Sequence, residues 1–212
     1  NKEHKAEFDL LTILLENLNK GILIKNVELT EDQKKLLKSI SPLTSKPTLY
    51  VANIKEDDLY DDDKNIYLQE LKKWSEKNNE KVLSLCTKFE MEIVDLSHEE
   101  KKEFLNSYSL DRTGLDRLTA ATFKLLGLET FFTAGEKEIK SWTVKKGSYA
   151  VDAAGEIHSD IQRGFIKAEI YSLADLIEFQ SEENLKSNGK IRQEGKNYIV
   201  QDGDIIFFKF NV

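Results

Sequence analysis

Two polar segments, each at the end of an apolar run, carry the residues of this sequence that are best suited to hold a ligand. The first is Asn53-Ile54-Lys55-Glu56, which follows TLYVA, and the second is Cys86-Thr87-Lys88, which follows VLSL. In nucleotide-binding sheets, one such loop presents an amide and a carboxylate to the base, and the next presents backbone N–H groups. The segments therefore suggest a base-binding site, with an ordinary turn as the alternative interpretation.

The length of the Glu56 side chain bears on which base such a site would accept. Guanine presents two adjacent donors, which one carboxylate can accept together, whereas adenine presents a donor beside an acceptor. Guanine-specific sites of this type carry an aspartate, and Glu56 is one methylene longer. Its carboxylate then need not lie in register with the base, so the sequence does not predict guanine specificity.

A parallel sheet is needed to bring the two segments together. The run TLYVAN is rich in β-branched and aromatic residues, as in a buried strand, and VLSLC is a second short strand. Between them, Leu68, Leu71 and Trp74 predict a helix that begins near residue 64. Strand, helix and strand in this order predict parallel pairing, with both segments at the carboxyl edge. Two strands are too few for a doubly wound domain, so we expect further strands from sequence outside these residues.

Helices are predicted on both sides of this unit. The first runs to Gly21 and the second begins at Thr30, which can cap it, and ends before Pro42. Later segments with helical spacing are FEMEIVDL, EEKKEFLNSY and GLDRLTAATFKLLGL. The first helix has one apolar stripe, which is either covered in an ordinary helical hairpin or needs a partner. The residues of the stripe are Phe8, Leu11, Leu14, Leu15 and Leu18.

The last third of the chain predicts a small mixed sheet wrapped on a helix, the β-grasp arrangement. We expect a hairpin over FFTAGEKEIKSWTV, a helix over AAGEIHSDI, and a strand with alternating faces over GFIKAEIYS. A polar helical linker leads to EGKNYIVQDGDIIFFKFNV, in which we expect two strands around the Asp202-Gly203 turn. The expected core residues are Phe131, Trp142, Ile157, Phe165, Ile199, Ile205 and either Phe208 or Phe210.

Composition excludes several classes of protein. The net charge of −7 argues against a broad basic face that coats nucleic acid, although a local basic patch is possible. With Cys86 as the single cysteine and three scattered histidines, neither a disulfide framework nor a metal site is expected. No long apolar run or basic-then-apolar start predicts a membrane segment or a signal peptide, so we expect a cytoplasmic protein without membrane contact.

Four segments match a known family. They are KPTLYVAN followed by IKE, GLDRLTAATFKLLGLETFFTAGEKEIKSWTVKKG, AAGEIHSDIQRGFIKAEI, and EGKNYIVQDGDIIFFKFNV. Together they resemble the YchF subfamily of the Obg-like translation-factor ATPases, over essentially the whole chain. The resemblance implies an α/β fold in three parts: a helical coiled-coil arm at 1–45, the later part of a P-loop G domain at 46–128, and a TGS domain of β-grasp type at 129–212.

The resemblance also implies a site and an activity. Asn53 and Glu56 match the N-x-x-E base motif of ATP-preferring members, Ile54 would contact the adenine, and Cys86 and Thr87 would form the backbone loop around the base. The intact protein would bind and hydrolyse ATP, or GTP, with magnesium. No G-x-x-x-x-G-K-[ST] phosphate loop occurs in the 212 residues, so we expect no catalytic residues, no bound cofactor and no hydrolysis from this fragment alone.

Two alternatives for the function remain from the sequence. The first is a carboxyl-terminal fragment of a ribosome-associated ATPase, which binds an adenine nucleotide in its intact form. The second is a non-enzymatic module that binds RNA or a ribosomal protein through its TGS domain and helical arm. Under either, a basic cluster is a candidate for the ribosome or RNA contact, although a solvated surface loop would look the same. The cluster comprises Lys186, Lys190, Arg192 and Lys196.

Overall fold

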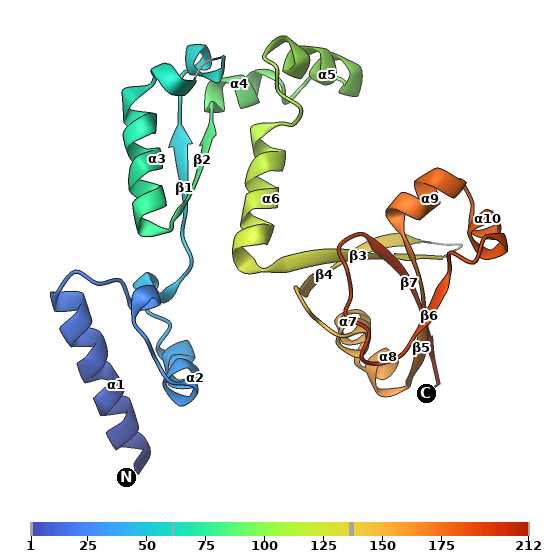
Figure 1. The fold of residues 1–212 in the computed structure, drawn as a ribbon, viewed down its shortest axis with the longest axis horizontal. Coiled ribbons are helices and arrows are strands. Elements are labelled where there is room, and N and C mark those ends of the chain that lie inside the picture. The colour runs from blue at the N-terminus through green and yellow to red at the C-terminus, as the bar shows by residue number, and fades with distance from the viewer. Residues whose placement is uncertain (1, 61, 136–137, 212) are drawn as a thin grey trace. The chain divides into compact units, whose positions relative to one another are not determined.

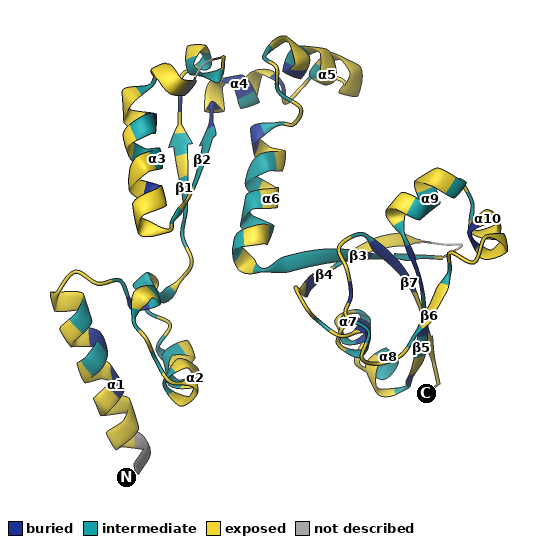
Figure 2. Cartoon of the chain, in the orientation of Figure 1, coloured by how far each residue is buried: buried dark blue, intermediate teal, exposed yellow. Residues whose placement is uncertain are grey.

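The computed structural model describes residues 2–60, 62–135 and 138–211 (Figure 1). The chain divides between Arg117 and Leu118 into two compact units, called here the amino-terminal and carboxyl-terminal units. Buried residues line the strands and one helix of the carboxyl-terminal unit, whereas exposed residues dominate the surface helices of both units (Figure 2).

The amino-terminal unit begins with the two predicted helices. Gly21 follows the first with φ of +75°, a left-handed conformation that ends helices, and Thr30 forms a capping box with Gln33 at the start of the second. Leu10, Leu14 and Ile24 are buried where the two helices meet. The helices are α1 (Lys2–Asn19) and α2 (Glu31–Ile40), and single 3-10 turns follow each, η1 (Ile24–Asn26) and η2 (Leu43–Ser45).

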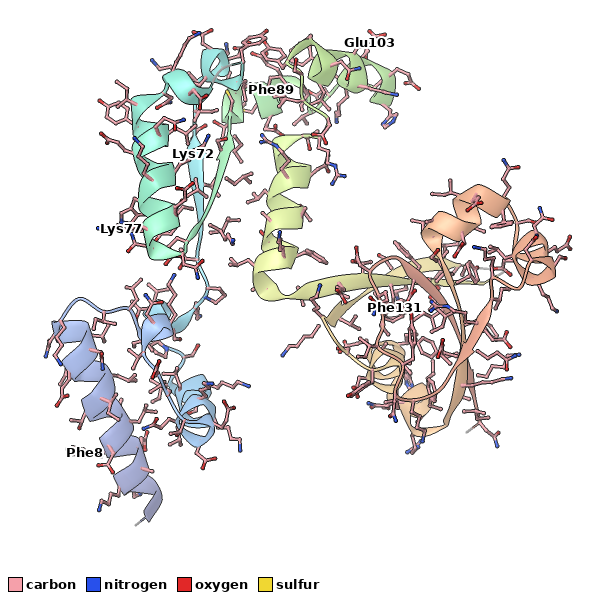
Figure 3. All side chains as sticks on the ribbon, viewed as in Figure 1. Phe8, Lys72, Lys77, Phe89, Glu103 and Phe131 are labelled. Atoms are coloured by element: carbon pink, nitrogen blue, oxygen red, sulfur yellow. The ribbon has the colours of Figure 1, made fainter. Side chains whose placement is uncertain are left out.

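The apolar stripe of α1 is only partly covered. Leu14 packs on the second helix with Leu10, which the sequence analysis did not select. The remaining stripe residues are exposed, with 69% of Phe8 accessible to solvent (Figure 3). They are Phe8, Leu11, Leu15 and Leu18. The helical hairpin therefore accounts for one side of α1 and leaves a second apolar side open.

The predicted strand–helix–strand unit is confirmed. The two strands pair in parallel from Leu49 opposite Lys81 to Asn53 opposite Leu85, and Asn65 caps the helix between them. Ile54, Phe89 and Leu105 lie in the core below the carboxyl edge. The elements in chain order are β1 (Leu49–Asn53), η3 (Glu56–Leu59), η4 (Asp62–Lys64), α3 (Ile66–Asn78), β2 (Lys81–Leu85), α4 (Thr87–Glu92), α5 (His98–Ser107) and α6 (Gly114–Leu126).

Two expectations for this unit were wrong. The first strand is not buried on both faces, because Val51 is 46% exposed. FEMEIVDL is not one helix: α4 ends at Glu92, since the chain turns at the buried Ile93 and Ser97 opens the next helix with its own capping box.

The carboxyl-terminal unit holds a five-stranded mixed sheet of order β4-β3-β7-β5-β6. The predicted hairpin is confirmed by the pairing of its two strands, with Phe131 opposite Trp142. Residues 136 and 137 lie outside the described residues. Strands β3 and β7 are parallel, and the other neighbours are antiparallel. The strands are β3 (Leu128–Ala134), β4 (Ile139–Lys145), β5 (Phe165–Ser172), β6 (Arg192–Glu194) and β7 (Asp204–Phe210).

In the described part of this unit, four helices follow the hairpin. The predicted helix around residues 153–161 is split at His158, whose extended backbone and side chain cap the second part through the N–H of Asp160. The first part contributes three buried alanines to the main core, where they meet Phe131, Ile170 and Phe208. The helices are α7 (Ala150–Ile157), α8 (Ser159–Arg163), α9 (Leu173–Phe179) and α10 (Glu182–Ser187).

The strand predictions near the carboxyl end needed two corrections. Simple alternation fails in β5, because an irregularity between Phe165 and Lys167 lets Phe165, Ala168 and Ile170 all be buried. Residues 198–201 do not form a strand but make one isolated bridge, from Ile199 to Tyr149.

The predicted core is otherwise found. Ile199 was wrongly placed in it, since 47% of this residue is exposed, and Phe208 rather than Phe210 is the buried member of its pair. Ile205 is buried in a second apolar cluster, on the side of the sheet away from the main core. Trp142 and Ile157 are partly buried and pack against the main core.

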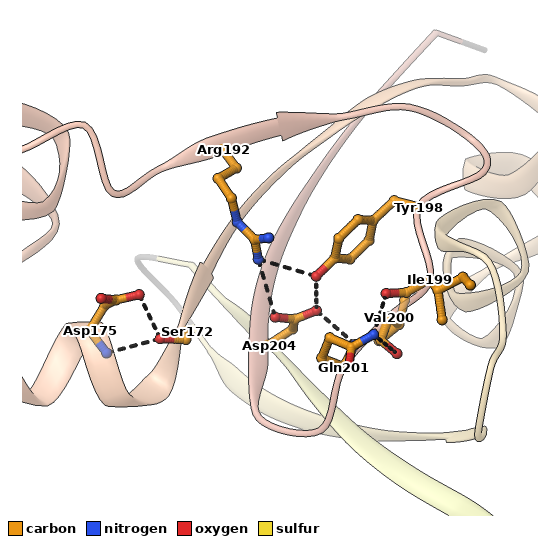
Figure 4. A network of polar contacts seen from close by, with 8 residues as sticks. All are labelled: Ser172, Asp175, Arg192, Tyr198, Ile199, Val200, Gln201 and Asp204. Carbon is orange, nitrogen blue, oxygen red and sulfur yellow. Dashed lines mark hydrogen bonds and ion pairs between the residues drawn. The ribbon is translucent and has the colours of Figure 1, made fainter.

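A buried carboxylate holds the last turn of the sheet. Asp204 is 2% exposed and accepts hydrogen bonds from the Tyr198 hydroxyl at 2.8 Å and the Gln201 N–H at 2.9 Å, with the Arg192 guanidinium 3.9 Å away (Figure 4). The adjoining Gly203 has φ of +83°. A buried charge costs stability unless it is paired and hydrogen-bonded, and these partners meet that need.

We expect Gly164→Ala to destabilise the carboxyl-terminal unit by about 3 kcal/mol, as overpacking against backbone does. A Cβ at Gly164 would lie 2.1 Å from the carbonyl oxygen of Asn211, so the end of the sheet must move. Urea unfolding followed by Trp142 fluorescence, in a Trp74→Phe background, measures this loss. Gly195→Ala is the control, because no atom lies within 4 Å of its Cβ. Equal losses in the two variants would contradict the steric explanation.

Candidate nucleotide-base site

The carboxyl edge of the two-stranded sheet carries an open concavity of about 430 Å³. It lies where β1 and β2 end, as the sequence analysis predicted for the two polar segments. Its lining residues are Asn53, Ile54, Lys55, Glu56, Asp57, Cys86, Thr87 and Lys88. All five predicted site residues are therefore neighbours, and Lys55, Asp57 and Lys88 join them.

Asn53 ties the two loops together. Its side-chain oxygen accepts hydrogen bonds from the backbone N–H and the hydroxyl of Thr87, both at 3.1 Å, and the N–H of Ile54 donates to the carbonyl of Leu85 at 2.9 Å. Because the amide oxygen is engaged, the group that Asn53 can offer a base is its NH2. Adenine and guanine both present a ring-nitrogen acceptor to such a donor.

Both carboxylate oxygens of Glu56 are held by protein groups. The Lys88 ammonium donates to one at 2.9 Å, and the Tyr108 hydroxyl donates to the other at 2.5 Å. These two donors, Lys88 first, hold the pKa of Glu56 below its ordinary value. The same contacts raise the pKa of Lys88 and hold the pKa of Tyr108 far above that of a free phenol.

Aromatic packing fixes the position of Tyr108. Its ring stacks on Tyr60 with centroids 4.7 Å apart and meets Phe89 edge-on at 4.8 Å, just after the end of α5. Sequence reasoning missed Tyr108, because it is 52 residues from Glu56 and belongs to no local motif. Its position directly after a helix rich in charged residues is the signal that could have indicated Tyr108, and it is a weak one.

Ile54 and Cys86 contribute mainly backbone to the concavity. Ile54 is 9% exposed and Cys86 is 3% exposed, and both side chains lie in the core with Phe89. Thr87, by contrast, is exposed. A base in the concavity would therefore meet the edge of Ile54 and the backbone near Cys86 rather than their whole side chains.

The described residues contain no cluster of three or more His, Cys, Asp or Glu side chains that could hold a metal ion. Asp61 of the acidic run DDLYDDDK lies outside the described residues. Within the same described ranges, no helix has the length and apolar character needed to cross a membrane.

The basic cluster of the carboxyl-terminal unit is not a free patch of positive charge. Lys190 donates to Asp175 at 3.0 Å. Arg192 donates to Tyr198 at 3.2 Å beside the buried Asp204 (Figure 4). Two of its four cations thus stabilise the fold. Charge reversal at Lys190 or Arg192 would disturb these internal contacts, so it cannot test ribosome or RNA contact cleanly.

Comparison with known proteins gives consistent matches. Residues 128–211 match the family YchF-GTPase_C, described as "Protein of unknown function (DUF933)". All 212 residues align with the "Ribosome-binding ATPase YchF" of Bacillus subtilis at 45% identity and with that of Escherichia coli O157:H7 at 40%. The chain spans 58% of the length of these curated relatives.

A solved structure agrees with these matches. The structure of the Schizosaccharomyces pombe YchF GTPase is similar to this chain with a TM-score of 0.81 and 29% identity. The similarity covers 98% of this chain and 55% of that one. The mixed α/β architecture therefore corresponds to that of the fission-yeast protein over nearly every residue.

We expect Lys88→Met to raise the pKa of Glu56 and Tyr108→Phe to raise it less, because the Lys88 contact is the larger cause of the depression. A depressed carboxyl pKa means that these contacts favour the folded state at neutral pH and lose that effect as the pH falls through the folded pKa. Carbon-detected NMR titration of the Glu56 carboxyl measures the midpoint. Lys102→Met on α5 is the control, and a midpoint that is the same in all variants would show that neither contact persists in solution.

Proposed function

The chain belongs to the YchF family, and from that premise we propose that it is the carboxyl-terminal part of a ribosome-associated hydrolase of ATP, or of GTP. Support comes from the identity of 45% over all 212 residues to a relative named as a ribosome-binding ATPase. In this proposal the concavity at the ends of β1 and β2 binds the base, and the partner of the intact protein is the ribosome. The protein works in the cytoplasm.

The state of Glu56 is the observation that carries the base assignment. A carboxylate that reads guanine must offer its oxygens to two adjacent donors of the base. In this protein one oxygen accepts from Lys88 and the other from Tyr108, so Glu56 is not presented to the base as that pairing requires. Adenine does not need such a carboxylate, and we propose that the site accepts adenine at least as well as guanine.

The residues present fit the base of a nucleotide and not its phosphates. Asn53 offers an amide donor, and the loop at Cys86 and Thr87 offers backbone groups around an open concavity of about 430 Å³. Mg²⁺ and a phosphate loop, when present, neutralise the charge that develops on the transferred phosphoryl group. The role of the residues described here is to bind and orient the base.

We propose the same three domains as the sequence analysis. The uncovered side of α1 supports a coiled-coil arm at 1–45, in which the exposed Phe8, Leu11 and Leu15 would pack on a partner helix of the coiled coil. The parallel β1–β2 pair supports part of a P-loop G domain at 46–128. The five-stranded mixed sheet with α7 in its core supports a TGS domain of β-grasp type at 129–212, although the compact unit begins earlier, inside α6.

The purified 212-residue chain is expected to hydrolyse neither ATP nor GTP. It has no phosphate loop, and a base site alone cannot position phosphates and magnesium. Phosphate release should equal the buffer blank under conditions in which the full-length protein turns over. Activity that elutes with the chain through two different columns would contradict the proposal.

In the full-length protein, Glu56→Asp should shift the preference from ATP toward GTP by about tenfold, the range of one good bidentate contact to a base. The shorter side chain loses its reach to Tyr108 and becomes available to the base. Competitive titration with the two nucleotides measures the ratio, and Glu70→Asp on the exposed side of α3 is the matched control. A wild-type protein that already prefers GTP strongly would overturn the base assignment.

A further inference from the structure

The carboxyl-terminal unit contains a second cavity, of about 250 Å³, on the side of the sheet away from α7. Ile206 and Phe208 pack in the main core with α7, so Ile205, Phe207 and Lys209 point to the other side of β7. The cavity opens there, between the strands and α10. Its lining residues are Ala134, Glu169, Tyr171, Glu182, Ile191, Ile205, Ile206 and Phe207.

The cavity combines two carboxylates with an exposed aromatic ring. Glu182 accepts a hydrogen bond from the Tyr171 hydroxyl at 2.5 Å through one oxygen, and Glu169 accepts from Lys209 at 3.0 Å through one oxygen. A carboxylate has acceptor capacity for more than one donor. Phe207, at the rim, is 56% exposed, and the Lys209 ammonium lies 5.8 Å from the centre of its ring.

The size of the cavity limits its occupant. Pockets for drug-sized ligands measure about 300–1,000 Å³, and this one is smaller. A single side chain of a protein partner fits that volume. The residues that most often anchor protein interfaces are tryptophan, tyrosine and arginine.

We propose that this cavity binds an arginine side chain of a basic protein partner, with the guanidinium stacked on Phe207 and paired with Glu182 and Glu169. Tryptophan and tyrosine each bring one donor, whereas arginine brings five in a planar fork and stacks on aromatic rings. Lysine would supply the charge, but its ammonium lacks the planar group that stacks on a ring and the fork of donors that two carboxylates can share. The two carboxylates disfavour a phosphate backbone, so an RNA strand is the weaker candidate.

This inference goes beyond the proposed function and does not depend on it. The cavity lies wholly within residues of the carboxyl-terminal unit, and none of the base-site residues lines it. Arginine binding could therefore be found in a protein that hydrolyses no nucleotide, and nucleotide binding could be found without it.

The test uses the 212-residue chain and a pair of small probes that differ in charge. N-acetyl-arginine methylamide carries the guanidinium, and N-acetyl-citrulline methylamide is its neutral isostere. In ¹⁵N NMR titrations, the arginine probe should shift the amide signals around Glu169, Tyr171, Glu182 and Phe207, and the citrulline probe should not. Glu182→Gln and Phe207→Val should each weaken binding by about fivefold, the upper range for an exposed ion pair and for an exposed cation–π contact.

The matched control is Glu183→Gln, on the same helix and outside the cavity lining, which should bind as the wild type does. Glu182→Gln keeps an acceptor for Tyr171, so its fold should be retained, and it decides the test alone if Phe207→Val unfolds. Equal shifts from both probes, equal effects of the two glutamine variants, or stronger shifts of the same signals by a short single-stranded RNA would overturn the proposal.

Discussion

The geometry of the base site depends on one side chain, the carboxamide of Asn53. It closes the gap between two loops that are 34 residues apart, by accepting both hydrogen-bond donors of Thr87. The parallel pairing of β1 and β2 brings Asn53 opposite Leu85, and only then can the amide reach the start of α4. The concavity and the backbone groups that line it follow from this register. A shift of one residue would turn Asn53 to the opposite face of the sheet.

Sequence was most informative where structure is set by local chemistry. Thr30 caps its helix as predicted, and Asn65 and Ser97, which were not singled out from the sequence, cap helices in the same way. Gly21 and Gly127 follow helix ends with positive φ. The parallel pair and the hairpin were also predictable, since hydrophobic period and connection length determine them. The five proposed base-site residues fell in one place because the ends of parallel strands meet at one edge.

What could not be predicted depends on contacts between distant segments. Tyr108 reaches Glu56 only because α5 folds back over the core, and no pattern near residue 108 announces it. The irregularity in β5 is similar, since an alternating sequence gives no sign that one residue will be accommodated outside the pairing. The basic cluster is a further case: its cations are close in sequence, and the sequence gives no sign that Lys190 and Arg192 face carboxylates from other elements. A ribosome or RNA contact of this cluster stays a prediction.

The burial of Cys86 shields the thiol of this residue from oxidation and alkylation. It is the single thiol of the chain and lies between β2 and α4, where it is 3% exposed and packs with Phe89. Only a thiolate that meets its reagent can be oxidised or alkylated. The rate at which the Cys86 thiol is modified is therefore set by how often this core opens, so that rate reports local opening. The carboxyl-terminal unit contains no cysteine, so thiol modification reports opening of the amino-terminal unit alone.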